Sequence, residues 1–380
     1  MNKKLVVGIT AEGSVNLLRG QLLHFKSLGY DTYLLAPYSD RVVNYCKEEG
    51  CEHLSIDIAR EISIWQDIKT LISIFRIFRK VKPDIVNLGT PKVALLGMIA
   101  AYLLRINKRI YTCRGFRFEH EGGNKKKILV TMEKITSACA HQIICISPSV
   151  KKLGMENGIF KNEKATVIGK GSSNGINLSL FNPLDEKLVL PHKALLSQLS
   201  LEGYFVFSFV GRIVDRKGVV ELFEAFNRLF QRNSKIRLLI VGPFETSQIV
   251  DKTIIEKIQQ HPGVVAVGKV PQEQVPLYLS ISDVFVLPAW WEGFGNVLIQ
   301  AAAMGIPVIS TNGTGTVDAV CDGYNGILVP IKDSKALESA MDELLANELK
   351  RKEMGENGKK WALHFDQSII WKGMQDLYNN

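Results

Sequence analysis

Cysteine pairs and long apolar runs are the features that this sequence of 380 residues lacks. Its six cysteines form no Cys-x-x-Cys pair and no other spacing typical of a zinc site. The longest apolar stretch, residues 93–104, is shorter than the ~20 residues that a membrane-spanning helix needs. Lys3 and Lys4 precede an apolar run that is too short for a secretory signal. We therefore expect reduced cysteines, no transmembrane anchor and a cytoplasmic protein.

Repeats, low-complexity tracts and Asp-x-Asp pairs are also missing. The first two absences argue against solenoid and disordered architectures. The third removes the acidic pair that would hold a divalent ion, so the sequence predicts no metal site. What is present is a chain with 46% hydrophobic residues, long enough for two buried cores.

The net charge of +9 is distributed unevenly along the chain. Residues 1–183 contain 27 Lys and Arg against 15 Asp and Glu, whereas residues 184–380 contain 20 against 23. The first half is therefore basic and the second slightly acidic. Such asymmetry predicts that the first half faces an anionic partner, which could be nucleic acid, acidic lipid or a phosphorylated substrate.

Strand-like apolar runs alternate with helical stretches in both halves of the chain. The expected strands are residues 5–10, 32–36, 84–88, 110–113, 142–146, 205–210, 237–241, 264–267, 284–287 and 307–310. The clearest expected helices are residues 17–28, 68–81, 219–230, 297–304 and 354–378. This alternation predicts an α/β fold made of two doubly wound, Rossmann-like domains.

The alternation is interrupted near Phe181-Asn182-Pro183, where we place the linker between the domains. The first domain is expected at residues 1–183 and the second at residues 184–363. A terminal helix at about residues 364–380 is expected to pack back on the first domain. Ligands bind at the carboxyl ends of parallel strands, so functional motifs should lie in the loops that follow strands.

One motif places a glycine and two cations after the strand expected at residues 205–210. Gly211 and Arg212 directly follow this strand, and Lys217 comes just before the next helix. A guanidinium and an ammonium at a helix start can bind a diphosphate, because the helix dipole adds to both charges. Taken alone, such a motif is more often a solvated basic turn, and the next motif supplies the context that favours ligand binding.

A second motif is a glycine-rich segment with one carboxylate, between the strand at 284–287 and the helix at 297–304. It reads Pro288-Ala289-Trp290-Trp291-Glu292-Gly293-Phe294-Gly295-Asn296. Its glycines allow close approach of the backbone to a ligand, and the amides at the helix start are free to donate. Glu292 suits sugar hydroxyls, although a carboxylate that only complements the helix dipole is the alternative. Gln300, about two helical turns along, would line nearly the same face.

Together these motifs resemble those of the large group 1-like family of retaining GT-B glycosyltransferases, which assemble bacterial surface polysaccharides and lipid-linked oligosaccharides. The second half adds Gly-x-Pro-Val-Ile-Ser at residues 305–310 and Asp-Gly-x-Asn-Gly-x-Leu-Val at 322–329. In the first half, Arg19-Gly20-Gln21 and the segments 111–115, 145–149 and 171–176 follow in the expected order. The resemblance covers essentially the whole chain and implies two domains that face a central cleft.

The resemblance also implies roles for individual residues. Arg212 and Lys217 would bind the donor diphosphate and stabilise it as it leaves, while Glu292 would hydrogen bond the donor sugar. Further donor contacts would come from Gly13, Ser14, Gly211, Gly268, Val270, Phe294, Gly295, Asn296 and Gln300. Glu12 and Arg114 would lie on the acceptor or phosphate side.

The implied reaction is transfer with retention of configuration by same-face attack, in which the leaving phosphate accepts the proton of the acceptor. Cations and helix amides would offset the charge of the departing diphosphate, so neither a metal nor another cofactor is expected.

Two positions depart from the family pattern. Gln300 replaces an acidic residue that usually binds the ribose hydroxyls; its amide can still donate and accept but has no charge. Arg114 stands where many members have histidine, and a guanidinium cannot act as a base. It could donate hydrogen bonds to a phosphate or a hydroxyl instead.

The expected substrates are a nucleotide diphosphate sugar and a saccharide acceptor linked to a lipid diphosphate. UDP is the expected nucleotide, although Gln300 leaves open a donor with another nucleotide. The basic segments at residues 67–80 and 125–127 predict peripheral contact with an anionic membrane, at the inner face of the plasma membrane; an ordinary solvated face is the alternative. A sugar-nucleotide epimerase and a non-catalytic nucleotide-sugar-binding protein are the competing functions. No nucleic-acid module is present, and no nucleic-acid partner is expected.

Overall fold

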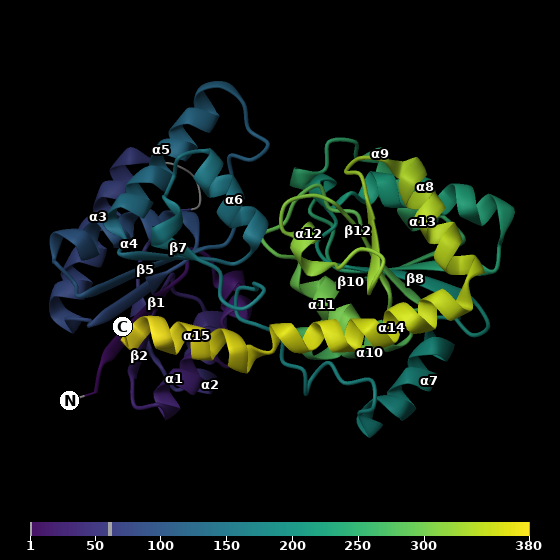
Figure 1. Ribbon diagram of the computed structural model, residues 1–380, viewed down its shortest axis with the longest axis horizontal. Coiled ribbons are helices and arrows are strands. Elements are labelled where there is room, and N and C mark those ends of the chain that lie inside the picture. The colour runs from purple at the N-terminus through teal and green to yellow at the C-terminus, as the bar shows by residue number, and fades with distance from the viewer. Residues whose placement is uncertain (1, 60–62, 380) are drawn as a thin grey trace. The chain divides into compact units, whose positions relative to one another are not determined.

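The computed structural model describes residues 2–59 and 63–379, and the chain divides into two compact units (Figure 1). Unit 1 comprises Met1–Gly175 and Ser368–Asn380, and unit 2 comprises Ile176–Gln367. The division falls between Gly175 and Ile176, upstream of the linker that the sequence predicts at residues 181–183. Residues 176–183 therefore belong with unit 2.

Unit 1 is built on a seven-stranded sheet with the order β3-β2-β1-β4-β5-β6-β7, in which neighbouring strands pair in parallel. Its strands are β1 (Lys4–Gly8), β2 (Asp31–Ala36), β3 (Glu52–Ser55), β4 (Ile85–Leu88), β5 (Lys108–Cys113), β6 (Gln142–Cys145) and β7 (Ala165–Thr166). Every residue of the central strand β4 is buried, because a parallel sheet is covered on both faces.

Two groups of helices cover the sheet of unit 1. One core joins the sheet to α3 (Ile64–Val81), α4 (Pro91–Leu103), α5 (Gly123–Cys139) and α6 (Pro148–Glu156). The other core joins it to α1 (Gln21–Ser27), α2 (Asp40–Glu49) and the C-terminal helix α15 (Gln367–Asn379). In this second layer Trp371 of α15 stacks on His24 of α1, with ring centroids 4.7 Å apart. The last helix of the chain thus completes the core of unit 1.

Several cations of unit 1 serve the fold itself. Lys4 Nζ donates to the carbonyl of Val81 at 3.0 Å, and Arg109 Nε donates to that of Cys139 at 2.7 Å. These carbonyls belong to the last residues of α3 and α5, where the helix dipole favours positive charge. Part of the basic character of the first half is therefore explained without any ligand.

Unit 2 contains a six-stranded parallel sheet with the order β10-β9-β8-β11-β12-β13. Its strands are β8 (Phe205–Val210), β9 (Ile236–Val241), β10 (Val264–Gly268), β11 (Val284–Leu287), β12 (Val308–Thr311) and β13 (Gly326–Val329). Its helices are α7 (Val189–Gln198), α8 (Val219–Arg232), α9 (Thr253–Gln260), α10 (Val275–Ser280), α11 (Asn296–Ala303), α12 (Thr316–Ala319), α13 (Ser334–Ala346) and α14 (Glu348–Ala362). The predicted doubly wound α/β architecture is confirmed in each unit.

The helix predicted at residues 17–28 is wrong at its start, because residues 17–20 are not part of α1. Residues Glu12–Leu17 form a 3-10 helix, and α1 begins only after Gly20, whose φ is +76°. The carboxylate of Glu49, on α2, accepts hydrogen bonds from the amides of Gly20 at 2.6 Å and Leu23 at 2.9 Å. This distant side chain caps α1, so local periodicity could not locate the start of the helix.

The single helix predicted at residues 354–378 is also wrong, because α14 and α15 are separate. Between them the amide of Ile176 donates to the carbonyl of Phe365 at 2.7 Å, and its carbonyl accepts from the amide of Gln367 at 3.2 Å. A distant backbone segment therefore takes the hydrogen bonds that a continuous helix would need.

The apolar stretch at residues 93–104 lies mostly in α4, whose side chains pack into the core. Across the described residues, the structure contains no helix with both the length and the apolar composition to cross a bilayer.

Candidate functional site

The two predicted donor motifs meet at one edge of the sheet in unit 2. Strands β8 and β11 pair in parallel, so the loops that follow Val210 and Leu287 leave the sheet side by side. The turn before α8 contains Gly218, whose φ is +69°. A Cβ atom there would lie 2.0 Å from the carbonyl oxygen of Pro288, so only glycine lets the two loops pack this closely.

Lys217, Arg216 and Glu292 form an ion cluster at this edge, hereafter the Lys217–Glu292 cluster. Lys217 Nζ forms an ion pair with Glu292 Oε1, and Arg216 Nη1 lies 3.4 Å from the same oxygen. The side chains of Lys217 and Glu292 are only 11% and 15% exposed. A cation and a carboxylate with little access to water interact more strongly than a surface pair.

Burial and neighbouring charges shift the pKa values of both partners. Burial lowers the pKa of Lys217 below its ordinary 10.5, and the nearby Glu292 carboxylate offsets this only in part. Burial alone would raise the pKa of Glu292, but Lys217, Arg216 and Arg212 together outweigh it and lower the pKa below 4.5. Glu292 is therefore ionised at neutral pH and can accept hydrogen bonds from hydroxyl groups.

Arg216 is held by the segment that carries Glu292. Its guanidinium lies over the ring of Trp291, 4.8 Å from the centroid, and its carbonyl accepts from the amide of Trp290 at 2.9 Å. The indole of Trp290 donates to Glu221 at 2.9 Å. Arg216, the residue before Lys217, is not among the site residues predicted from the sequence, but the structure makes it a direct partner of Glu292.

Arg212 has a different carboxylate partner from Lys217. Its Nη1 lies 2.8 Å from Glu245 Oε2, in the loop after β9. Arg212 is still close enough to lower the pKa values of Lys217 and Glu292. The structure therefore brings the two predicted phosphate-binding cations near each other, but Arg212 must share its guanidinium between Glu245 and any ligand.

Three glycines connect the loops that follow β8, β9 and β10. The amide of Gly211 donates to the carbonyl of Val241 at 2.8 Å, and that of Gly242 donates to the carbonyl of Gly268 at 2.7 Å. A Cβ atom on Gly242 would lie 1.8 Å from the carbonyl oxygen of Gly211. The loop that begins at Gly268 and contains Val270, two of the expected donor contacts, is thus linked through Gly242 to the loop that carries Arg212.

The loop after β12 supports the Glu292 segment, which the sequence reasoning missed. The amide of Glu292 donates to the carbonyl of Thr314 at 2.8 Å. Cβ atoms on Gly313 and Gly315 would lie 2.4 Å from the Trp290 oxygen and 2.3 Å from the Glu292 oxygen. The signal was present as Gly-Thr-Gly at residues 313–315, shortly after a strand, a pattern typical of close backbone approach.

Helix α11 begins at the predicted donor segment. Its N-cap is Gly295, with φ of +77°, and Asn296 and Gln300 follow one turn apart, both partly buried. Phe294 is buried and packs against Phe365, with ring centroids 5.2 Å apart. The ring of Phe294 therefore belongs to the core, and only its backbone remains available for the predicted donor contact.

In unit 1 the predicted phosphate loop follows β1. Glu12, Gly13 and Ser14 begin the 3-10 helix Glu12–Leu17, and Glu12 and Gly13 are exposed. The turn is closed by the amide of Ser14, which donates to the carbonyl of Ala11 at 2.9 Å.

Arg114 follows β5, at the same edge of the unit 1 sheet, and its Nε donates to Ser173 Oγ at 2.7 Å. A Cβ atom on Gly89 would lie 1.8 Å from Arg114 Nη1, so this glycine makes room for the guanidinium. Burial lowers the pKa of Arg114 to about 10, and only Tyr111, Tyr378 and Cys113 oppose the shift. Within residues 2–59 and 63–379, no carboxylate forms an ion pair with it.

The backbone around Arg114 adopts two unusual conformations. Thr90 and Ser172 have φ values of +133° and +101°, which non-glycine residues rarely adopt. The Thr90 hydroxyl accepts from the amide of Thr10 at 2.8 Å. Strain of this kind is typical of ligand-binding sites.

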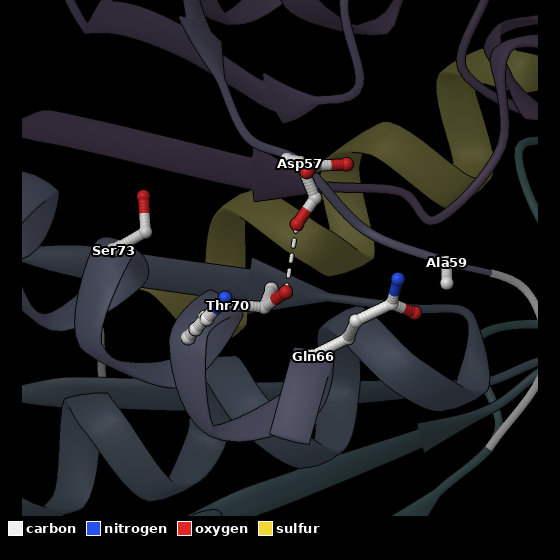
Figure 2. A pocket seen from close by; sticks show the side chains of 6 residues that line it. Asp57, Ala59, Gln66, Thr70 and Ser73 are labelled. Carbon is white, nitrogen blue, oxygen red and sulfur yellow. Dashed lines mark hydrogen bonds between the residues drawn. The ribbon is translucent and has the colours of Figure 1, made fainter. Parts of the chain in front are cut away.

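A separate cavity of about 240 Å³ lies beside α3 in unit 1 (Figure 2). Asp57, Gln66, Lys69, Thr70 and Ser73 line it, and Thr70 Oγ1 donates to the carbonyl of Asp57 at 2.7 Å. None of the predicted site residues belongs to this lining.

Comparisons with known proteins agree with this division of the chain. Residues 196–361 match the family model "Glycosyl transferases group 1", and residues 10–147 match "Glycosyl transferase 4-like". Among solved structures, Anabaena HepE in complex with UDP and glucose superposes with a TM-score of 0.81 at 16% identity, covering 99% of each chain. This likeness supports the GT-B fold.

Two relatives resemble the chain in sequence. One is the Staphylococcus aureus capsular polysaccharide biosynthesis glycosyltransferase CapM, 37% identical over 383 residues, covering 100% of this chain and 97% of CapM. Another is the Escherichia coli UDP-Gal:alpha-D-GlcNAc-diphosphoundecaprenol alpha-1,3-galactosyltransferase, 28% identical over 82% of this chain and 79% of that protein. With a full-length relative at this identity and both family models matched, the chain belongs to the group 1 glycosyltransferases, with a GT-B fold.

Proposed function

We propose that the protein transfers a sugar, with retention of configuration, from a UDP-sugar to a saccharide linked to a lipid diphosphate, in the assembly of a surface polysaccharide such as a capsule. The observation that carries the proposal is the Lys217–Glu292 cluster, which combines cations for a diphosphate with a carboxylate for sugar hydroxyls. The names of the two relatives support the donor, the lipid diphosphate and the polysaccharide.

On the donor side, Lys217 and Arg212 bind the diphosphate, and Glu292 accepts hydrogen bonds from the sugar. The bond between the sugar anomeric carbon and the UDP oxygen breaks, and a new bond to the acceptor oxygen forms on the same face. The proton of the acceptor hydroxyl passes to the leaving phosphate. In other transferases a metal ion stabilises the negative charge that develops on the leaving diphosphate. Here we propose that preorganised cations stabilise this charge, so that no metal is needed.

On the acceptor side, we assign Arg114 to a phosphate of the lipid diphosphate. Arg114 is largely removed from water and has no carboxylate partner among the described residues. Burying such a charge costs folding free energy unless a ligand supplies the counter-charge. Its guanidinium also offers several donors in a fixed plane, which suits phosphate oxygens. The lipid part of such an acceptor places the reaction at the inner face of the plasma membrane.

Binding and turnover test this proposal. In a thermal-shift panel of nucleotide diphosphate sugars, UDP-sugars should raise the melting temperature most, because a ligand that binds only the native state stabilises it. Incubation with the donor alone should give only slow hydrolysis; an epimer would instead indicate an epimerase. Transfer should persist in chelator, and the anomeric configuration of the product, measured by NMR, should match that of the donor. An inverted product would contradict the mechanism.

A further inference from the structure

The outward face of α3 carries four large apolar side chains that the protein leaves in water. Ile64 and Trp65 are 74% and 79% exposed, and Ile68 and Ile72 are each 45% exposed. At 3.6 residues per turn, Ile64, Ile68 and Ile72 form one stripe along the helix. The buried residues Ile74 and Phe78 lie on the opposite side and pack on the unit 1 core. The helix is therefore apolar on two faces, of which only one has a partner.

Cations flank this stripe. Lys69, Arg76, Arg79 and Lys80 follow it along the outer half of the helix. No ion pair within the described part of the chain involves any of the four. Asp67, the one acidic residue in the helix, is already paired with Lys92 at 2.6 Å and is turned toward the protein. The outward face is thus apolar with a positive border.

The polar cavity marks the limit of this face. Gln66, Thr70 and Ser73 lie on the flank of α3 rather than on the apolar stripe, and they line the cavity together with Lys69 (Figure 2). The helix therefore changes from apolar to polar within about a quarter turn, as expected for a helix that lies at a boundary between lipid and water.

The second basic segment differs from α3. Lys125 is paired with Glu121 at 2.6 Å, and Lys126 lies over the ring of Phe118, 6.0 Å from its centroid. Two of the three lysines in this run thus have partners within the protein. The structure therefore favours α3, rather than the run at residues 125–127, as the basic surface that is available to an anionic partner.

We propose that the outward face of α3, defined by Ile64, Trp65, Ile68 and Ile72 with the flanking cations, inserts into the headgroup region of an anionic bilayer. Apolar side chains would enter the acyl boundary, the indole would sit at the interface, and the cations would contact lipid phosphates. This inference rests on the proposed function, because a lipid-linked acceptor requires the enzyme to reach a membrane.

Vesicle flotation of the full chain tests the proposal, with vesicles of phosphatidylglycerol mixed with phosphatidylcholine and vesicles of phosphatidylcholine alone. The wild type should float with the anionic vesicles at low salt and lose binding at high salt. Ile68→Ser with Ile72→Ser should weaken binding by at least about tenfold, because less apolar surface is transferred from water. Arg76→Gln with Arg79→Gln should weaken it about fivefold per cation, only on anionic vesicles.

Matched variants make the outcome specific. Leu190→Ser with Leu349→Ser removes two apolar side chains of unit 2 that are even more exposed than Ile68 and Ile72, and this variant should bind vesicles like the wild type. Unchanged binding of the α3 variants, or loss of binding only in Lys125→Gln with Lys127→Gln, would overturn the proposal. A dimer that Ile68→Ser with Ile72→Ser dissociates in sedimentation velocity would assign the face to a second copy and also overturn it.

The two proposals fail in different ways. Vesicle binding needs neither donor nor acceptor, whereas transfer to a water-soluble acceptor needs no membrane. Transfer without vesicle binding would remove the α3 inference and leave the proposed function intact. Vesicle binding by a protein that transfers no sugar would leave the α3 inference intact and remove the proposed function.

Discussion

Replacing Lys217 by alanine tests the donor site most sharply, because this residue combines burial, charge and contact with Glu292. In the proposed mechanism the ammonium of Lys217 stabilises the departing diphosphate, and loss of one such preorganised donor costs roughly 3–4 kcal/mol of transition-state stabilisation. We therefore expect kcat to fall by about 10²–10³-fold at saturating donor. The assay is transfer from a UDP-sugar to a water-soluble acceptor. Lys352→Ala, which removes an exposed partner of Glu348, is the control and should change kcat less than about twofold.

Stability must be separated from catalysis in this variant, because Glu292 loses its nearest cation. Arg216 remains 3.4 Å away, so the carboxylate keeps one partner and the cost should be roughly 1–3 kcal/mol. This is smaller than the ~5–15 kcal/mol that keeps a domain folded, so the variant should melt lower but remain native at assay temperature. Wild-type kcat in folded Lys217→Ala and Arg212→Ala would refute the assigned roles.

The pH profile gives a second readout of the same residue. Burial lowers the pKa of Lys217 below 10.5, so the wild type should lose activity on the alkaline side before an ordinary lysine would deprotonate. Lys217→Arg should keep its charge and shift this loss to higher pH, even if its kcat is lower. An alkaline limb that is the same in both proteins would show that another group titrates.

Three further substitutions test other parts of the structure. Glu133→Gln should raise the free energy of unfolding by about 3 kcal/mol at alkaline pH, because burial raises the pKa of Glu133 from 4.5 to about 7. The protonated carboxyl stabilises the wild type below pH 4.5, and this contribution is lost as pH rises through 7, so urea titrations should show the variant's advantage vanishing in acid. Arg114→Gln should raise KM about 10- to 100-fold for an acceptor with a diphosphate, and not for a neutral alkyl glycoside. Glu245→Gln should release Arg212 and lower the donor KM a few-fold.

Each of these has an outcome that would count against it. An advantage of Glu133→Gln that is equal at all pH values would mean that the carboxyl does not titrate in this window. A change in donor KM alone for Arg114→Gln would move Arg114 to the donor side. A rise in donor KM for Glu245→Gln would mean that this carboxylate itself contacts the donor.

The sequence predicted correctly that the two motifs of unit 2 lie together, for a topological reason. Lys217 and Glu292 are 75 positions apart, but each follows a strand, and β8 and β11 are neighbours in a parallel sheet. Buried strands are short apolar runs that periodicity detects, and ligand-binding loops follow their carboxyl ends. Once both motifs were placed after strands, their proximity followed.

Contacts between distant side chains could not be predicted in the same way. The pairing of Arg212 with Glu245 depends on the path of a loop after β9, which contains no periodic signal. The late start of α1 depends on a carboxylate from α2 that caps it. The outward face of α3 was predicted as basic, but its apolar stripe emerged only when the buried side of the helix was known. Local sequence fixes the period of a helix, whereas its neighbours decide which side is covered.

The central claim is that cations of unit 2, without a metal ion, bind the donor diphosphate. A crystal structure of the protein with a bound UDP-sugar, prepared in the presence of chelator, tests this claim most directly. We expect phosphate oxygens within hydrogen-bond distance of Lys217 and Arg212, with the sugar hydroxyls on Glu292. Phosphates bound away from these side chains, or a donor that binds only when magnesium replaces the chelator, would contradict it.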